Sequence, residues 1–172
     1  MPATLPATTA AEFKSGMRRL ASGVTIITTA HDGQRHGLTA TAVASLSADP
    51  PQLLVCVNRT AGAHDLIHAG ERFCVNVLAQ RHRALATRFS THGVSETERF
   101  KAGKWTTLAT GAPVLEDALA SFDCEVLERV RAASHTIYIG RVVGVRARQS
   151  GRPLLYESGN YASLRALRSK MK

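Results

Sequence analysis

The stretch His36–Asn58 reads HGLTATAVASLSADPPQLLVCVN, and it decides how the rest of the chain can fold. Threonine and valine within residues 38–45 favour a β-strand, but three alanines and a serine leave the surface of that strand nearly bare. A flat ligand can approach such a backbone closely and hydrogen-bond to its amides, carbonyls and hydroxyls. Asp49-Pro50-Pro51 then predicts a turn or polyproline bend, because proline fixes its own φ and restricts the preceding residue. Residues 52–57 are expected to resume as a buried strand.

The residues before this stretch predict a helix followed by a hairpin. Thr9-x-x-Glu12 is typical of a capping box, and apolar residues at helical spacing predict a helix over residues 10–21, which Gly23 ends. Residues 24–29 are β-branched and predict a strand. The sequence His31-Asp32-Gly33-Gln34 predicts a tight turn that returns the chain into the bare strand.

The residues after the stretch predict short helices between further strands. Helices are expected over residues 61–69 and 80–90, with a strand over residues 72–78 between them. Residues 91–104 are polar and are expected to form a loop, a candidate lid or dimer arm, before an extended piece from Trp105 to Pro113. Alternating residues over 122–127 and 136–145 predict a second antiparallel hairpin. About seven strands with two or three helices predict a mainly β protein, folded as a closed antiparallel barrel.

Length and terminal sequences predict a single domain without a membrane span. The 172 residues fit one domain at 11–165, between a flexible tail at 1–10 and a basic tail at 166–172. No run of 18 apolar residues marks a membrane span, so no membrane partner is expected. Residues 1–9 lack the basic start and apolar segment of a secretory signal, and a cytoplasmic location is therefore expected.

Charge and composition argue against several other classes of protein. The formal charge is +9, yet the basic residues never form a block of five, and aromatic residues are only 5%, so no nucleic-acid partner is expected. The excess charge suits small anionic partners instead. Cys56, Cys74 and Cys124 stand among apolar residues without a Cys-x-x-Cys pair, which predicts buried, reduced thiols. The histidines show no metal-ligand spacing, and no Gly-x-Gly-x-x-Gly indicates a Rossmann site.

Besides the opening stretch, the chain contains five further distinctive blocks: residues 21–29 (ASGVTIITT), 72–78 (RFCVNVL), Arg88-Phe89, 134–140 (SHTIYIG) and 153–156 (PLLY). Taken together, these blocks resemble the flavin reductase-like domain family of short-chain NAD(P)H:flavin oxidoreductases. The blocks keep the family's order and spacing from about residue 13 to residue 161. The resemblance implies the FMN-binding split β-barrel, an antiparallel Greek-key barrel flanked by short helices, which in this family is usually a homodimer with flavin at the subunit interface.

The resemblance also implies an activity. It implies a reductase that transfers a hydride from NADH or NADPH to FMN or FAD and supplies reduced flavin to a separate oxygenase component, as does the reductase of 4-hydroxyphenylacetate hydroxylase. Two alternatives stay open: a non-catalytic flavin- or heme-binding protein on the same barrel, and a small nucleic-acid-binding β-barrel.

The resemblance further implies a set of site residues. His135, at the start of a strand, is the candidate catalytic residue and is expected to face the nicotinamide. The expected flavin contacts are Thr39, Ala40, Thr41, Ala42, Ser45, Ser47, Asn58, Arg59, Thr60, Asn76, Arg88, Phe89 and Tyr156, with Tyr161 near the ring edge. Each has a structural alternative: a thin packed strand for residues 39–47, a helix cap for Arg59 and Thr60, and backbone pairing for the amide of Asn76.

Overall fold

The computed structural model describes residues 8–165, so the tail predicted at 166–172 and most of the tail predicted at 1–10 lie outside the described residues. Within this range the chain forms the following elements in order: α1 (Ala10–Met17), β1 (Ser22–Gly23), β2 (Thr25–His31), β3 (Gln34–Ala40), β4 (Val43–Ala48), β5 (Pro51–Asn58), α2 (Gly62–Gly70), β6 (Arg72–Val77), the 3₁₀ helix η1 (Gln80–His82), α3 (Arg83–Ser90), α4 (Glu96–Lys101), β7 (Trp105–Thr107), β8 (Pro113–Leu115), β9 (Ala120–Ala132), β10 (His135–Ala147), β11 (Leu154–Glu157) and β12 (Asn160–Ser163).

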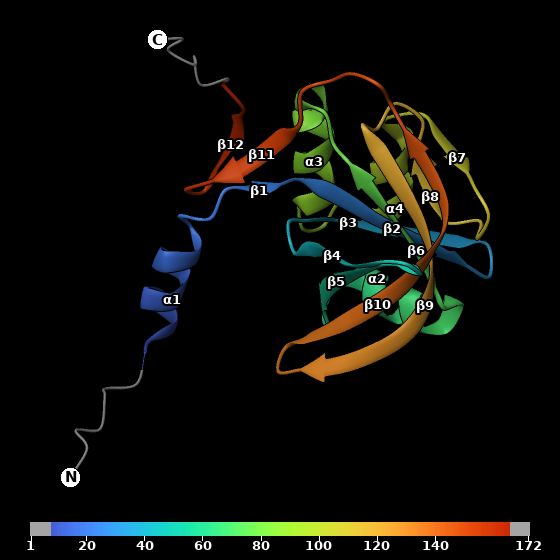
Figure 1. Cartoon of the computed structure of the whole chain (residues 1–172), viewed down its shortest axis with the longest axis horizontal. Coiled ribbons are helices and arrows are strands. Elements are labelled where there is room, and N and C mark those ends of the chain that lie inside the picture. The colour runs from blue at the N-terminus through green and yellow to red at the C-terminus, as the bar shows by residue number, and fades with distance from the viewer. Residues whose placement is uncertain (1–7, 166–172) are drawn as a thin grey trace.

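The central element is a seven-stranded antiparallel sheet in the order β3-β2-β6-β9-β10-β5-β4 (Figure 1). Its two edge strands, β3 and β4, are consecutive in the chain and are joined only by Thr41 and Ala42. The three Cα–Cα steps from Ala40 to Val43 span at most about 11 Å. In a flat sheet of seven strands the two edge strands would lie about 29 Å apart. The sheet must therefore curl until its edges approach each other, which gives the predicted barrel.

This arrangement corrects the prediction of one bare strand over residues 38–45. The segment divides at Thr41 and Ala42, and its two halves lie on opposite edges of the sheet. β3 ends where Ala40 faces Thr25 of β2, and β4 begins where Val43 faces Val55 of β5. Strand pairing, rather than the residues of the segment, sets the break.

Two local predictions are confirmed. In the β2–β3 hairpin His31 faces Gln34, and Asp32 and Gly33 have positive φ angles of 48° and 73°, as the tight turn requires. At α1 the Thr9 hydroxyl accepts from the Glu12 amide at 3.2 Å, and the Glu12 carboxylate accepts from the Thr9 amide at 2.8 Å. The helix ends at Met17, however, and not at residue 21.

The segment predicted as a loop at 91–104 contains α4. The Ser95 hydroxyl caps this helix by accepting from the Glu98 amide at 3.3 Å. Glu96 fixes α4 to the barrel: its carboxylate accepts from the Gly37 amide of β3 at 3.1 Å and pairs with His36 at 3.2 Å. After α4, β7 and β8 form a short hairpin in which Pro113 begins a strand, instead of ending one.

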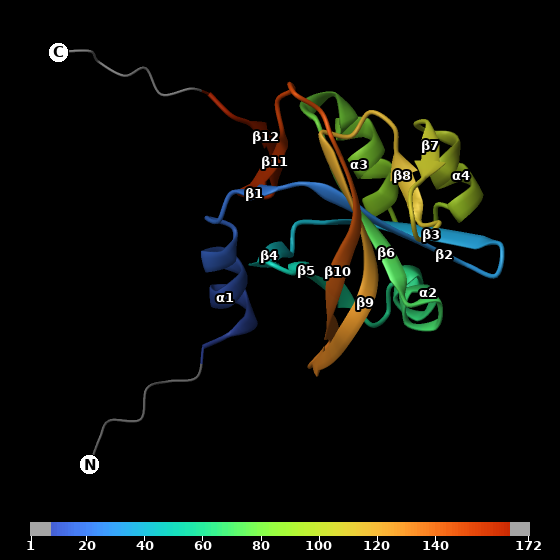
Figure 2. The same ribbon diagram turned by 45° about the vertical axis from the view of Figure 1, so that its right-hand side comes forward.

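The buried apolar residues form two principal clusters on the two sides of the sheet. One lies inside the curl beneath α2 and includes Phe73, Val55 and Tyr138. The other packs α3, α4 and the C-terminal hairpin against β2 and β8, and includes Phe89, Phe100 and Leu154. Figure 2 shows α2 on one side of the sheet and α3 and α4 on the other.

A buried polar network centred on Asn76 ties β6 to its neighbours. Asn76 is fully buried, and its Oδ1 accepts from the Leu115 amide at 2.8 Å and from the Ser121 hydroxyl at 2.9 Å. Its Nδ2 donates to the carbonyl of Ile26 at 3.2 Å and to the hydroxyl of Thr28 at 3.1 Å. The amide therefore has its partners within the protein.

The cysteines match the predicted buried thiols at two positions out of three. Cys74 and Cys124 are buried, and burial raises the pKa of the Cys124 thiol to about 12 and also raises the pKa of Cys74. Cys56 is only half-buried, on β5. All three are free thiols.

In the described residues no helix is long and apolar enough to cross a membrane.

Candidate functional site

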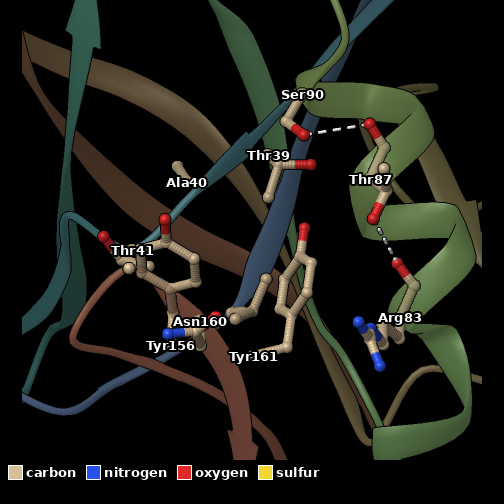
Figure 3. Close-up of a pocket in the computed structure, with 11 residues that line it drawn as sticks. Thr39, Ala40, Thr41, Arg83, Thr87, Ser90, Tyr156, Asn160 and Tyr161 are labelled. Atoms are coloured by element: carbon tan, nitrogen blue, oxygen red, sulfur yellow. Dashed lines mark hydrogen bonds between the residues drawn. The ribbon is translucent and has the colours of Figure 1, made fainter.

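A pocket of about 480 Å³ opens between the end of β3, helix α3 and the β11–β12 hairpin (Figure 3). Its volume lies within the range of sites for small molecules and cofactors. The residues that line it are Val24, Thr39, Ala40, Thr41, Arg83, Thr87, Ser90, Tyr156, Gly159, Asn160 and Tyr161.

Helix α3 is seated closely on β3, and this contact forms one wall of the pocket. Gly37 makes the approach possible, since a Cβ there would stand 2.6 Å from the ring of Phe89. Two residues further along β3, the Thr39 hydroxyl donates to the carbonyl of Ala86 at 2.7 Å. Thr87 and Ser90 consequently face the pocket beside Thr39.

The opposite wall is the β11–β12 hairpin, which carries two tyrosines. Tyr156 and Tyr161 face each other across the strands, with ring centroids 5.6 Å apart in an edge-to-face arrangement. The hairpin turns at Ser158 and Gly159, both with positive φ. Its base is fixed to the barrel because Leu154 is buried and its amide donates to the carbonyl of Leu78 at 2.9 Å.

Three hydroxyls of this pocket present acceptors to a ligand. The hydroxyl protons of Thr39, Thr87 and Ser90 are donated to backbone carbonyls of α3, so their oxygens are left to accept from a ligand. Arg83 is the charged residue among those that line the pocket, and its guanidinium lies over the Tyr161 ring at 5.9 Å from the centroid. A ligand with hydroxyl or amide donors, an aromatic part and a negative group fits such a surface.

A second hollow of about 260 Å³ adjoins the pocket and shares Thr41, Tyr156 and Gly159 with it. Lys14 of α1 and Arg18, which follows the helix, contribute basic side chains to its lining. The two hollows thus lie side by side, one with Arg83 and the other with Lys14, Arg18 and Glu157 among their lining residues.

Four of the predicted flavin contacts meet in the pocket: Thr39, Ala40, Thr41 and Tyr156. Three others continue from them along the chain without lining it. Ala42 lies in the link to β4, where its carbonyl accepts from the Cys56 amide at 3.0 Å. Ser45 and Ser47 lie on β4, an edge strand with an irregularity in its pairing between these two serines.

A second group of predicted residues meets at the far end of β5 and β10. Asn58 faces His135 across the two strands, and its Oδ1 accepts from the Thr60 amide and hydroxyl, both at 3.0 Å. The amide of Arg59 donates to the carbonyl of Ser134 at 3.0 Å, and the Ser134 hydroxyl lies 2.9 Å from Nδ1 of His135. The structure brings these residues together, but none of them lines the pocket.

The remaining three predicted residues lie outside both groups. Asn76 belongs to the buried network, and Phe89 is a core residue that contacts Phe100 and Trp105 edge-to-face or tilted. Arg88 leaves α3 on another side, where its Nη1 donates to the carbonyl of Glu98 at 3.0 Å and the side chain lines a separate open depression.

Sequence reasoning missed Arg83, Thr87, Ser90 and Asn160. The first three carry a signal, because positions i, i+4 and i+7 of a helix share one face. In Figure 3 they project from one side of α3 toward the tyrosines. Asn160 follows Gly159 in the hairpin turn and has no comparable pattern.

Within residues 8–165 no group of three or more His, Cys, Asp or Glu side chains is placed to hold a metal ion. The described lining of the pocket includes hydroxyls, two tyrosine rings, an amide, backbone groups and one guanidinium.

Residues 17–165 match the model of a family described as flavin reductase like domain. Among curated proteins, the chain is 43% identical over 153 residues to the FMN reductase (NADH) RutF of Agrobacterium fabrum, an alignment that covers 89% of this chain and 87% of the relative.

Solved structures with similar folds carry related names. BorF, the flavin reductase component of a bacterial two-component tryptophan halogenase, superposes with a TM-score of 0.84 at 30% identity, over 92% of this chain and 100% of the other. The NADH:FAD oxidoreductase SgcE6 of Streptomyces globisporus, in complex with NAD and FAD fragments, gives a TM-score of 0.82 at 25% identity, over 94% of both chains.

Proposed function

Because the chain belongs to the flavin reductase-like domain family, we propose that it is an NADH-dependent flavin reductase. The observation that carries the proposal is the pocket at the end of β3, where a nearly bare backbone meets two tyrosine rings and a row of acceptor hydroxyls. The mixture of flat, apolar and acceptor surface suits an isoalloxazine ring and its polyhydroxyl chain.

The bound flavin supplies the redox chemistry by accepting a hydride from reduced nicotinamide. The residues of this chain supply position. Ala40 and Thr41 leave room for a ring close to the backbone, and the oxygens of Thr39, Thr87 and Ser90 can accept from the ligand's hydroxyls. Holding two reactants in one orientation converts a chance encounter into an effectively unimolecular step.

His135 keeps its proposed role opposite the nicotinamide, and Asn58, Arg59 and Thr60 form its surroundings. These residues lie on the barrel end beyond Ala42, not in the pocket. We propose that they contact the nicotinamide or the outer part of the flavin, while the pocket residues hold the rest.

The preferred substrates are FMN and NADH in this proposal, since relatives that share 40–44% of their residues with this chain are named FMN reductase (NADH). FAD and NADPH are the alternatives. The name of SgcE6 supports FAD as an acceptor within this fold.

We further propose a homodimer. Phe13, Met17 and Leu20, in and just after α1, are large apolar residues exposed to solvent, and so is Val130 on β9. Figure 1 shows α1 standing away from the barrel. Covering these side chains with a second copy would bury apolar surface, which stabilises association.

The proposal also covers the partner protein and the cellular compartment. Reduced flavin would pass to a separate oxygenase or halogenase component, as the name of BorF describes for that protein. A reducing compartment such as the cytoplasm suits a protein with three free thiols.

The test is rapid mixing of the purified protein with NADH or NADPH against FMN, FAD and riboflavin, followed by absorbance of the nicotinamide. We expect flavin-dependent oxidation that is fastest with NADH and FMN. A protein that binds flavin and stays inert toward both nicotinamides would instead be a binding protein. Light scattering at micromolar concentration checks the dimer, and a mass near 18.5 kDa with full activity would contradict it.

A further inference from the structure

Arg83 brings a positive charge to the wall of the pocket. Among the described residues that line the pocket, Arg83 alone carries a charge and none is acidic. Within residues 8–165 it forms no ion pair, whereas Arg81 on the preceding turn is paired with Asp117 at 3.2 Å. Its guanidinium therefore has donors free for a ligand.

The position of Arg83 is fixed from two sides. Its backbone carbonyl accepts from the Thr87 hydroxyl at 3.1 Å, and its side chain lies over the Tyr161 ring. Tyr161 in turn packs on the apolar cluster of Phe89 and Leu154. A planar guanidinium held against an aromatic ring loses less conformational freedom when it binds a phosphate in bidentate fashion.

The neighbouring polar groups make the assignment specific. The hydroxyls of Thr39, Thr87 and Ser90 already donate their protons to carbonyls, so they present oxygens, which an anion does not favour. Among the described residues that line the pocket, Arg83 is therefore the one that offers a positive charge to an anion.

We propose that Arg83 binds a phosphate ester of a substrate and so allows the enzyme to discriminate phosphorylated from unphosphorylated substrate. The phosphate can belong to the flavin nucleotide or to the pyrophosphate of NADH, since both present the same chemistry. This inference rests on the proposed reductase function. It displaces Arg88, the arginine of α3 expected from the sequence, whose guanidinium is turned to the carbonyl of Glu98.

The experiment compares Arg83→Ala, Arg83→Met and Arg83→Lys with wild type. Flavin fluorescence measures binding of FMN and of riboflavin, and steady-state rates give KM for NADH with riboflavin as acceptor. If the phosphate is that of the flavin, Arg83→Ala and Arg83→Met weaken FMN binding about tenfold and leave riboflavin binding unchanged. If it is that of NADH, KM for NADH rises about tenfold and FMN binding is unchanged. Arg83→Lys restores part of either loss.

Arg81→Ala is the matched control, because it removes the same charge from the same segment outside the pocket, and we expect no change in either measurement. The inference is overturned if the Arg83 variants change FMN and riboflavin binding equally, or change nothing, or if Arg88→Ala alone gives the phosphate-dependent loss. Arg83→Met keeps the apolar stem over Tyr161, so its melting temperature separates a folding defect from lost binding.

The outcomes for this inference and for the reductase function are distinguishable. A wild-type protein that oxidises no NADH overturns the proposed function, and the fluorescence titrations still decide the role of Arg83 toward FMN. An active wild type with unaffected Arg83 variants overturns only the phosphate assignment.

Discussion

The two asparagines Asn76 and Asn160 show the difference between the interior of the barrel and its pocket. Asn76 is fully buried, and both atoms of its amide have partners in the surrounding strands. Asn160 is exposed at the pocket wall, and within residues 8–165 its Nδ2 donates to a single partner, the carbonyl of Ser158 at 3.1 Å. A polar residue in an apolar strand is thus structural here, and the capacity to bind a ligand lies where hydrogen bonds are left incomplete.

The largest expected effect is a loss of stability when the buried amide of Asn76 is removed. Asn76→Ala leaves the Leu115 amide and the Ser121 hydroxyl without their acceptor in the core. We expect the free energy of unfolding to fall by about 3 kcal/mol or more. Urea titration measures it, with Asn160→Ala as the matched control, which should lose less than about 0.5 kcal/mol. Equal losses in the two variants would contradict the contrast.

The next largest effect is expected on ligand affinity when the pocket is filled by a bulky side chain. Thr41→Trp places a large ring where the pocket and the adjoining hollow meet, at an exposed position that the core does not depend on. We expect flavin or nicotinamide affinity to fall about a hundredfold, about 2.7 kcal/mol, with the melting temperature unchanged. Thr107→Trp on β7, exposed and distant from both hollows, is the control. Unchanged kinetics in Thr41→Trp would show that the substrates bind elsewhere.

His135 tests whether the second group of residues belongs to the same site. His135→Ala should lower the efficiency of reduction by NADH about tenfold to a hundredfold, about 1–3 kcal/mol, if one hydrogen bond to the nicotinamide is lost. Flavin binding, followed by fluorescence, should change much less. If flavin is lost while reduction is normal at saturating flavin, His135 belongs to the flavin contacts; if neither changes, it is structural.

The smallest effect concerns the half-buried cluster of His36, Glu96 and Arg99. Burial lowers the pKa of His36 from its ordinary value of 6.5, and the nearby positive charge of Arg99 lowers it further. As the pH falls below 6.5, His36 therefore takes up a proton less readily in the folded protein than in the unfolded chain. Stability from this residue is present above that pH and is lost as the pH falls through the folded pKa. Burial raises the pKa of Glu96, with the opposite sign: its contribution is lost as the pH rises above 4.5.

The measurement is the melting temperature against pH. Between about pH 7 and pH 5.5 it should fall more steeply for wild type than for His36→Asn, because Glu96 is present in both. His92→Asn, at an exposed position, should follow wild type. Parallel curves for wild type and His36→Asn would show that His36 does not titrate differently on folding.

Local signals in the sequence predicted the local structure well. Asp32-Gly33 predicted the hairpin, and Thr9-x-x-Glu12 predicted the cap of α1. Ser95-x-x-Glu98 has the same pattern and marks the start of α4, although the polar residues around it were interpreted as a loop. The alternation over 122–127 and 136–145 predicted β9 and β10, which extend several residues further.

Features that depend on distant pairing could not be predicted in the same way. Neither glycine nor proline marks the break at Thr41-Ala42; it follows from the partners of Ala40 and Val43. The structure brings Thr39, Ala40, Thr41 and Tyr156, which the resemblance gives as flavin contacts, to one pocket. The resemblance could not show that Phe89 lies in the core and that Arg88 donates to Glu98. Arg83 enters the site only through the docking of α3 on Gly37.

The two-residue link between β3 and β4 has a consequence for how the barrel opens. Because Thr41 and Ala42 tie one edge of the sheet to the other, each edge is held at a high effective concentration near its counterpart, as in a short tethered pair. Neither edge can peel away far without stretching the link or carrying the other with it. The backbone amides at these two edges should therefore exchange with solvent as one cooperative unit, although β3 and β4 share no hydrogen-bonded register.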